Sequence, residues 1–204
     1  MSKQVIVDYI GSIQFTPEQI NESLAQNAGK LVVSGIMQRG STGNERNYNQ
    51  NGRSYPVDIL KRESEKYKNV FIKERRALGE LDHPESSVVN LANVSHNVID
   101  LWWDGNDLMG RIEILPTPSG NIAKELLRSG IRLGISSRGM GSVKNLGEGK
   151  VEVQDDFEIV CWDLVSNPST QGAFMDNLNE SVQVKKTQKY AKINSLINDI
   201  ISIM

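Results

Sequence analysis

The segment from Val98 to Leu115 constrains the fold more than any other part of this 204-residue chain. Its first arm is rich in β-branched and aromatic residues, and Asp104-Gly105-Asn106-Asp107 then supplies residues typical of tight turns. A second apolar arm begins at Leu108. The pattern predicts a β-hairpin, which is stable only when it packs against further strands or helices.

Other apolar runs predict that strands dominate the core. Residues 31–37 form a β-branched run before a glycine- and asparagine-rich loop, and residues 131–136 form another run that ends at Ser136. Two more runs cover 151–153 and 157–165. We therefore expect roughly six to eight strands against three or four helices.

Three segments carry helix signals. Thr16-Pro17-Glu18-Gln19 supplies an N-cap, a proline at N1 and a glutamine at N3, which predicts a helix over 17–27. The polar segment 56–67 keeps its apolar residues on one side, which indicates a surface helix that ends before Asn69. Residues 122–128 contain paired leucines shortly before a glycine and indicate a short amphipathic helix.

Length and composition predict one main domain with appendages. The chain is long enough to bury a core, and with 38% hydrophobic residues it is on the polar side for a globular protein. We expect an N-terminal extension of a strand and a helix over 1–29, a main domain over 30–174 and a helical tail over 175–204. Residues 181–204 are basic and have apolar residues at helical spacing, so the tail is predicted to be a separable amphipathic helix.

Charge and cysteine content argue against several classes of function. The net charge is -2, the isoelectric point is near 5.8 and the body has no basic stripe, so nucleic-acid binding is not expected. No stretch approaches the length of a membrane span or resembles a secretory signal. The single cysteine, Cys161, has no internal partner for a disulfide, which favours a reducing cytoplasm. No metal or cofactor is expected.

Two segments contain residues suited to acyl transfer. The chain has only two histidines, His83 and His96, so any chemistry that needs an imidazole must use one of them. His83 precedes a proline in an acidic turn, and Ser136 lies where a predicted strand reaches a glycine-rich stretch. Taken singly, a histidine or a serine in such a segment is more often a structural residue in a turn than a catalytic residue.

The order of several motifs is more specific than either residue alone. The motifs occur in the following order: Asn49-Gln50-Asn51-Gly52-Arg53-Ser54-Tyr55-Pro56, Ala77-Leu78-Gly79-Glu80-Leu81-Asp82-His83-Pro84, Trp102-Trp103 with Gly110-Arg111, Gly134-Ile135-Ser136-Ser137-Arg138-Gly139-Met140-Gly141-Ser142, and Asp163-Leu164-Val165-Ser166-Asn167-Pro168-Ser169. Together they resemble the prohead core protease of myovirus-type tailed phages, over about 31–174.

The resemblance implies an α+β fold and a serine endopeptidase. The fold would be a mostly antiparallel β-barrel like that of the herpesvirus assemblins, with surrounding helices and a C-terminal amphipathic helix. His83 would be the general base and Ser136 the nucleophile. Backbone N–H groups of Ser137, Arg138 and Gly139 would hold the oxyanion, and the Arg138 side chain would either assist them or form a structural ion pair.

Several residues are candidates to orient His83. Asp163 lies where the family also carries an acid, and it is the first choice. Assemblins instead use a second imidazole that follows the serine, and this chain has no histidine beyond His96. Glu80 and Asp82, which are close to His83 in sequence, and His96 itself remain alternatives.

The resemblance also implies substrates and a place of action. The family cleaves scaffold and capsid proteins, and itself, inside the immature head in the host cytoplasm. It cuts after a glutamate that lies two residues beyond a leucine or isoleucine, a pattern found here at Glu22, Glu74, Glu80, Glu148 and Glu180. We expect self-cleavage after Glu180 because it lies at the junction with the basic tail.

Three questions stay open from the sequence. The tail helix either packs on its own domain or docks the zymogen in the scaffold core, and a homo-oligomer is neither favoured nor excluded. A non-enzymatic capsid-assembly or scaffold protein with the same fold is an alternative function. A cysteine hydrolase that uses Cys161 and a histidine is another.

Overall fold

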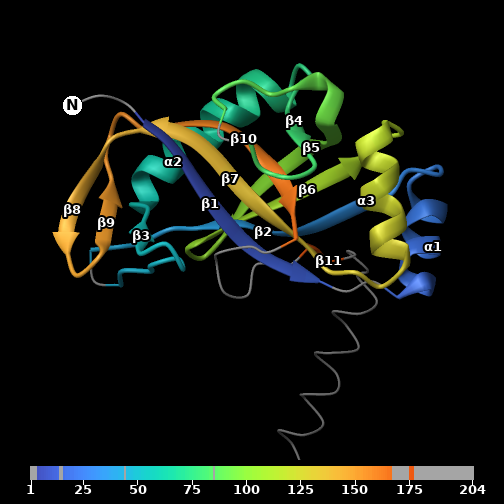
Figure 1. The fold of residues 1–204 in the computed structure, drawn as a ribbon, viewed down its shortest axis with the longest axis horizontal. Helices are drawn as coiled ribbons and strands as arrows, with labels where there is room; N and C mark the ends of the chain where they lie inside the picture. Colours follow the sequence, from blue (N-terminus) through green and yellow to red (C-terminus); the bar gives the residue numbers. More distant parts are fainter. Residues whose placement is uncertain (1–3, 14–15, 44, 85, 167–174, 177–204) are drawn as a thin grey trace, which may run out of the picture.

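The computed structural model describes residues 4–13, 16–43, 45–84, 86–166 and 175–176. This part of the chain is an α+β fold with eleven strands and three α-helices, so strands dominate as predicted (Figure 1). No helix within it is long and apolar enough to cross a membrane.

Three antiparallel strands form the first sheet. They are β1 (Gln4–Ile13), β7 (Leu133–Gly141) and β10 (Glu158–Val165), and β7 lies between the other two. Nearly every residue of β7 is buried because β7 has a neighbour on each side and elements above and below it. Ser136 lies at the middle of this central strand.

A second sheet contains the predicted hairpin. Its strands, in spatial order, are β11 (Met175–Asp176), β2 (Val32–Arg39), β6 (Asp107–Ile114), β5 (Val94–Asp104) and β4 (Leu78–Glu80). β5 and β6 pair up to Asp104 and Asp107, and Gly105 adopts a φ of +58° in the turn between them. The hairpin is confirmed, although its first strand begins four residues earlier than predicted.

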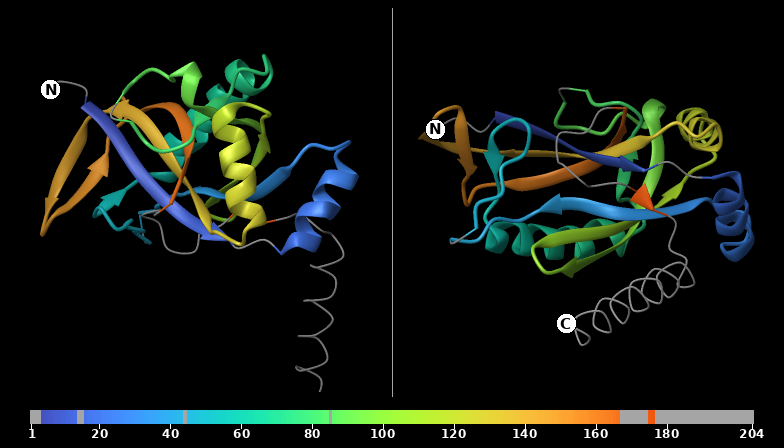
Figure 2. Two further views of the ribbon diagram at one scale, coloured as in Figure 1. Left: turned by 45° about the vertical axis from the view of Figure 1, so that its right-hand side comes forward. Right: turned by 90° about the horizontal axis from the view of Figure 1, so that it is seen from below.

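The two sheets meet along a seam between β4 and β10. Leu81, directly after β4, forms an isolated bridge with Leu164, and the N–H of Asp82 donates to the Leu164 carbonyl at 2.8 Å. Within the described residues the strand ladders form open sheets and do not close into a barrel. A third sheet of β3 (Arg53–Ser54), β9 (Lys150–Val153) and β8 (Val143–Gly147) projects at the opposite end of the molecule from α1 and α3 (Figure 2).

The predicted helices are present, with shifted boundaries. α1 (Pro17–Gln26) begins with the expected capping box between Thr16 and Gln19. α3 (Pro118–Arg128) begins four residues before the predicted start, because the Thr117 hydroxyl caps the N–H of Gly120 at 3.0 Å. A short 3₁₀ turn, η2 (Leu91–Asn93), precedes β5.

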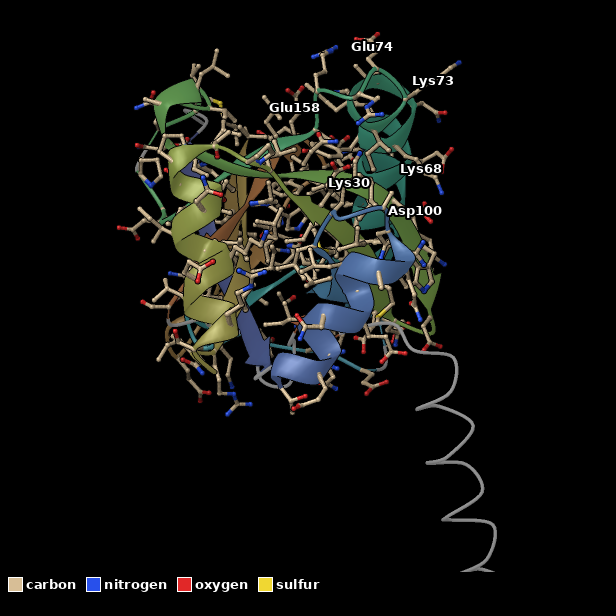
Figure 3. All side chains as sticks on the ribbon, turned by 90° about the vertical axis from the view of Figure 1, so that its right-hand side faces the viewer. Lys30, Lys68, Lys73, Glu74, Asp100 and Glu158 are labelled. Atoms are coloured by element: carbon tan, nitrogen blue, oxygen red, sulfur yellow. The ribbon has the colours of Figure 1, made fainter. Side chains whose placement is uncertain are left out.

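The second helix ends at Tyr67, before Asn69 as predicted, but a further turn that was not predicted follows it. α2 (Val57–Tyr67) continues as a π-helical turn, η1 (Lys68–Ile72). The Tyr67 ring stacks on Phe71 in this turn and meets Trp162 edge-on. The Lys68 ammonium also reaches the Leu101 carbonyl at 2.9 Å and Asp100 at 3.1 Å (Figure 3), so contacts with the hairpin hold the extra turn.

The predicted end of the strand at Ser136 is wrong. β7 continues to Gly141, and its residues pair with β1 on one side and β10 on the other. A side chain at Gly139 or Gly141 would collide with Phe157. These glycines therefore allow close packing within a sheet and do not form a turn.

Both expected appendages have residues in the body's sheets. β1, expected in the N-terminal extension, is a strand of the sheet that contains Ser136. Met175 and Asp176, the first residues of the expected helical tail, pair with β2 as a strand. Residues 177–204, with the expected tail helix and Glu180, lie outside the described residues, and the division at 29 and 174 stays a prediction.

Candidate active site

The site is built on the pairing of β7 with β10. Ser136 lies directly opposite Asp163, so the two side chains project from the same face of the sheet. On the other side of β7, Tyr9 of β1 occupies the position opposite Ser136. Ser136 and Asp163 are both fully buried, so the sheet fixes their backbones within the core.

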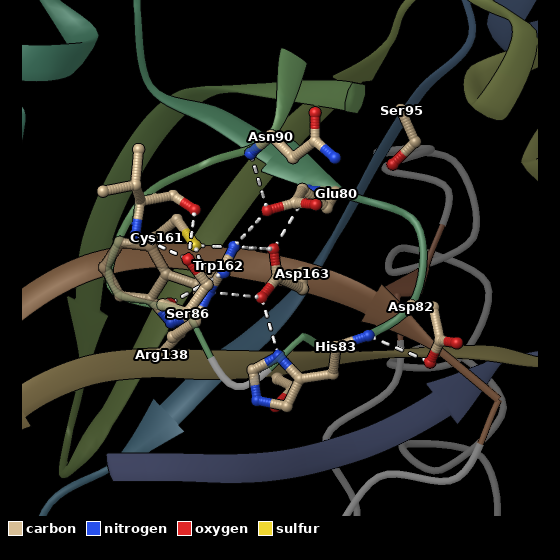
Figure 4. A network of polar contacts seen from close by, with 12 residues as sticks. Glu80, Asp82, His83, Ser86, Asn90, Ser95, Arg138, Cys161, Trp162 and Asp163 are labelled. Carbon is tan, nitrogen blue, oxygen red and sulfur yellow. Dashed lines mark hydrogen bonds and ion pairs between the residues drawn. The ribbon is translucent and has the colours of Figure 1, made fainter. Parts of the chain in front are cut away.

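The loop after β4 brings His83 to the same face. Asp82 has a positive φ of +71°, and its carboxylate accepts from the His83 N–H at 2.9 Å. The Asp82 N–H also donates to the Leu164 carbonyl, so this residue is anchored to the seam between β4 and β10. The chain thus turns sharply just before His83 and directs the imidazole toward β7 and β10 (Figure 4).

A continuous line of polar contacts joins the three side chains. His83 Nδ1 lies 2.7 Å from Asp163 Oδ2, and His83 Nε2 lies 3.2 Å from Ser136 Oγ. Only 1% of the His83 side chain is exposed. A carboxylate only accepts hydrogen bonds, so Nδ1 carries the proton in the neutral ring and Nε2 is left to accept from the serine hydroxyl. The arrangement can move a proton from Ser136 to His83.

Asp163 is held in its ionised form. Burial raises the pKa of this carboxyl, but the hydrogen bond from His83, the charge of Arg138 and the Glu80 N–H outweigh burial and lower it below its usual value. The Glu80 N–H donates to Asp163 Oδ1 at 2.9 Å, and Arg138 Nε lies 3.0 Å from Oδ2. Asp163 is therefore an anion beside the imidazole at neutral pH.

Arg138 is a buried ion-paired residue, one of the two roles expected from the sequence. Its guanidinium reaches Glu80 at 2.7 Å, Asp163 at 3.1 Å and the Ser86 carbonyl at 2.9 Å. Burial lowers the pKa of Arg138, but Cys161, Asp163 and Glu80 together raise it above its usual value. The guanidinium lies beside the Asp163 carboxylate, as Figure 4 shows.

The alternatives to Asp163 make their hydrogen bonds elsewhere. Glu80 binds Arg138 and the Asn90 N–H, and Asp82 binds the backbone of His83. His96 is fully buried between the Ser95 hydroxyl and the Trp162 carbonyl, at 2.9 and 3.0 Å. Burial lowers the pKa of His96 to about 4, so this imidazole is neutral and structural.

The structure does not favour the expected oxyanion-binding N–H groups or a cysteine nucleophile. Ser137, Arg138 and Gly139 were expected to hold the oxyanion through their N–H groups at the end of a strand, but they lie inside a strand that is paired on both sides. Cys161 is fully buried, and burial raises the pKa of its thiol well above the usual value. A cysteine nucleophile needs an accessible thiolate, which this environment disfavours.

Backbone groups complete the site and had no sequence signal. The Asn90 N–H donates to Glu80, and the Ser86 carbonyl accepts from Arg138. Both groups come from the loop that follows His83.

In the described part of the chain, no three His, Cys, Asp or Glu side chains are grouped so that they could bind a metal ion.

The chain is similar to known proteins over most of its length. A family model described as prohead core protein serine protease matches residues 11–183, a segment that contains all three side chains. The prohead core protein protease of Enterobacteria phage T4 is 35% identical over 149 residues, which cover 71% of this chain and 68% of the relative. The solved structure of the bacteriophage T4 capsid assembly protease matches with a TM-score of 0.67 at 26% identity, covering 82% of this chain and 100% of that chain. The chain therefore belongs to the prohead core protein serine protease family and is a serine endopeptidase of capsid maturation.

Proposed function

We propose that Ser136 is the nucleophile of this endopeptidase, that His83 is its general base and that Asp163 orients His83. The observation that carries the proposal is the unbroken line from Asp163 Oδ2 through both ring nitrogens of His83 to Ser136 Oγ, with separations of 2.7 and 3.2 Å. The same order of carboxylate, imidazole and hydroxyl activates serine in unrelated hydrolases.

The mechanism follows from the proton positions. His83 Nε2 removes the hydroxyl proton as Ser136 Oγ attacks the scissile carbonyl, and Asp163 stabilises the imidazolium that forms. The imidazolium then protonates the leaving amine, and water attacks the acyl-enzyme in a second, equivalent round. Because Ser136 and the His83 ring are buried, the surrounding chain must move before a substrate carbonyl reaches Oγ.

The substrates are inferred from the relatives. The T4 relatives are named a prohead core protein protease and a capsid assembly protease. We infer that this chain acts inside the immature head in the host cytoplasm, on scaffold and capsid proteins. We further infer that the two sheets belong to a barrel of the assemblin type, since they already meet at β4 and β10.

Self-cleavage is proposed after Glu180, which would release 181–204 as a tail helix. Burial and local shape disfavour two of the other matching glutamates as cleavage sites. Glu80 is fully buried, and Glu148 lies in the tight turn between β8 and β9 with a positive φ of +52°. A protease binds its substrate as an extended strand, so neither position is a suitable substrate in the folded protein.

The roles can be tested with four proteins: the wild type and the variants Ser136→Ala, His83→Ala and Cys161→Ala. We expect the wild type and Cys161→Ala to produce self-cleavage fragments, because burial raises the pKa of the Cys161 thiol and makes it a poor nucleophile. Ser136→Ala and His83→Ala should stay intact on the same time scale, as judged by mass spectrometry. Undiminished processing by Ser136→Ala would falsify the assignment, and an intact wild type would favour the non-enzymatic alternative.

A further inference from the structure

We propose that Glu80 and Arg138 are positioning residues that act through Asp163 and supply the negative environment in which His83 becomes an imidazolium during catalysis. This inference rests on the proposed roles of His83, Ser136 and Asp163. It concerns two residues outside the line of proton transfer, which the sequence presented as an alternative orienting acid and an oxyanion helper.

Arg138 and Glu80 both hold Asp163 in place. Arg138 contacts both carboxylates, with Nη2 at 2.7 Å from Glu80 and at 3.1 Å from Asp163, and all three side chains are fully buried. The Glu80 backbone also donates to Asp163 Oδ1 at 2.9 Å. Asp163 is thus held by Glu80 on β4 and by Arg138 on β7, and its Oδ2 lies between Arg138 Nε and the imidazole.

Arg138 and Glu80 also fix the loop that carries His83. Arg138 Nη1 donates to the Ser86 carbonyl at 2.9 Å, and Glu80 Oε1 accepts from the Asn90 N–H at 3.0 Å. Both contacts lie C-terminal to His83, whereas the bond between Asp82 and Leu164 anchors the loop before it. The position of the ring therefore depends on Glu80 and Arg138 as well as on Asp163.

The buried cluster of Glu80, Asp163 and Arg138 also has an excess of negative charge. Glu80 and Asp163 carry two negative charges and Arg138 carries one positive charge, so the cluster is one cation short while His83 is neutral. Within the described residues, Glu80 Oε2 has no hydrogen-bond partner, as expected where acceptors outnumber donors. An uncompensated buried charge is destabilising, and a proton on His83 would balance it.

Neighbouring titratable groups do not change this charge count. Burial raises the pKa of Cys161 and of Tyr67 well above their usual values, and it lowers the pKa of His96 to about 4, so all three are neutral near pH 7. Asp82, at the start of the loop, is exposed and faces solvent. The excess negative charge of the cluster is therefore balanced most directly at His83.

The experiment is a titration of the His83 ring by NMR in the Ser136→Ala protein, which cannot cleave itself. The chain has only two histidines, and the signals of His96 are assigned with a His96→Gln variant. Glu80→Gln removes one negative charge with little change of shape, so the midpoint of the His83 titration should fall by about half a pH unit or more. Arg138→Met should move it in the opposite direction.

Glu63→Gln is the matched control. Glu63 is also a buried glutamate paired with an arginine, since its side chain is 6% exposed and lies 3.0 Å from Arg62, but it lies on α2. We expect Glu63→Gln to leave the midpoint unchanged. In the active enzyme, Glu80→Gln should lower kcat about tenfold with KM unchanged, and it should shift the acidic limb of the kcat/KM profile to lower pH.

The outcomes separate this inference from the proposed function. A His83 midpoint that stays the same or rises in Glu80→Gln, or that falls equally in Glu63→Gln, overturns the role of the cluster. A lower midpoint in Glu80→Gln alone supports it, and a higher one in Arg138→Met strengthens that support. The ring titration needs no activity, so it stands even if processing by Ser136→Ala disproves the nucleophile.

Discussion

At the scale of single residues, His96 shows how burial sets the charge of an imidazole. Its pKa is lowered to about 4, whereas an unfolded chain protonates histidine near 6.5. Between these values the unfolded chain binds a proton that the folded protein does not bind, so stability falls as pH falls. The difference of about 2.5 units is worth about 3 kcal/mol of unfolding free energy between pH 6.5 and 4.

The test of this effect is denaturant unfolding between pH 7 and 4 in the Ser136→Ala background. Replacing His96 with glutamine should flatten the loss of stability by about 3 kcal/mol, because the amide does not titrate and can still donate to Trp162. An equally steep loss in His96→Gln would show that other groups control the acid sensitivity.

Asp163→Asn should abolish most of the activity without unfolding the protein. An asparagine cannot favour the Nδ1–H form of His83, so the other ring nitrogen no longer accepts the serine proton, and kcat should fall by about 10⁴. Kinetics on a peptide with a Leu-x-Glu sequence would measure this loss. Asp155→Asn is the control, since Asp155 pairs with Arg62 on the surface and should leave kcat unchanged.

How far the site was predictable differs from residue to residue. The motif order led to the proposal of His83 and Ser136, and it ranked Asp163 above Glu80, Asp82 and His96. The backbone partners of Arg138 and Glu80 were beyond prediction, because every residue offers the same N–H and carbonyl. The burial of Arg138 was equally hidden, since its two carboxylate partners come from strands far apart in the sequence.

At the scale of elements, the seam between β4 and β10 is the critical contact. Gly79 packs so closely there that an added Cβ would overlap the Trp162 carbonyl and the His96 ring. Gly79→Ala should therefore cost more than about 3 kcal/mol of unfolding free energy and displace the His83 loop. Thermal unfolding of Ser136→Ala proteins would measure the change.

Gly43→Ala is the control for the seam. Gly43 has no atom within 4 Å of an added Cβ and no positive φ, so this substitution should leave the melting temperature nearly unchanged. A seam that tolerates Gly79→Ala as well as Gly43→Ala would mean that β4 and β10 are not tightly packed.

The elements themselves were predictable where local signals were strong. The capping box of α1 and the turn of the β5–β6 hairpin depend on neighbouring residues, and both were found. The continuation of β7 past Ser136 was not predictable, because a glycine can serve either a bend in the chain or close packing within a sheet. Only the position of Phe157 across the sheet distinguishes the two.

At the scale of the whole molecule, self-cleavage should change the length of the chain. The wild type is expected to lose residues 181–204, and Glu180→Gln should retain them because the glutamate that directs cleavage is gone. Glu148→Gln is the control, since Glu148 lies in a tight hairpin turn and should not affect processing. Intact-mass spectrometry follows all three, and a wild-type enzyme that is active yet complete would contradict the site.

The arrangement of the whole molecule was expected only in outline. Composition and apolar runs predicted a strand-rich α+β fold, but the pairing of β1 with β7 joins residues more than a hundred positions apart. Such pairing depends on which strand edges remain available after the rest of the sheet has formed, and no local pattern records it.

The most direct test of the central claim is to map a fluorophosphonate adduct on the wild-type enzyme. These reagents phosphonylate a serine whose hydroxyl has been activated by a neighbouring base. We predict a single adduct on Ser136 that disappears in His83→Ala and persists in Cys161→Ala. An adduct on another residue, or undiminished labelling of Ser136 without His83, would contradict the assignment of these two residues.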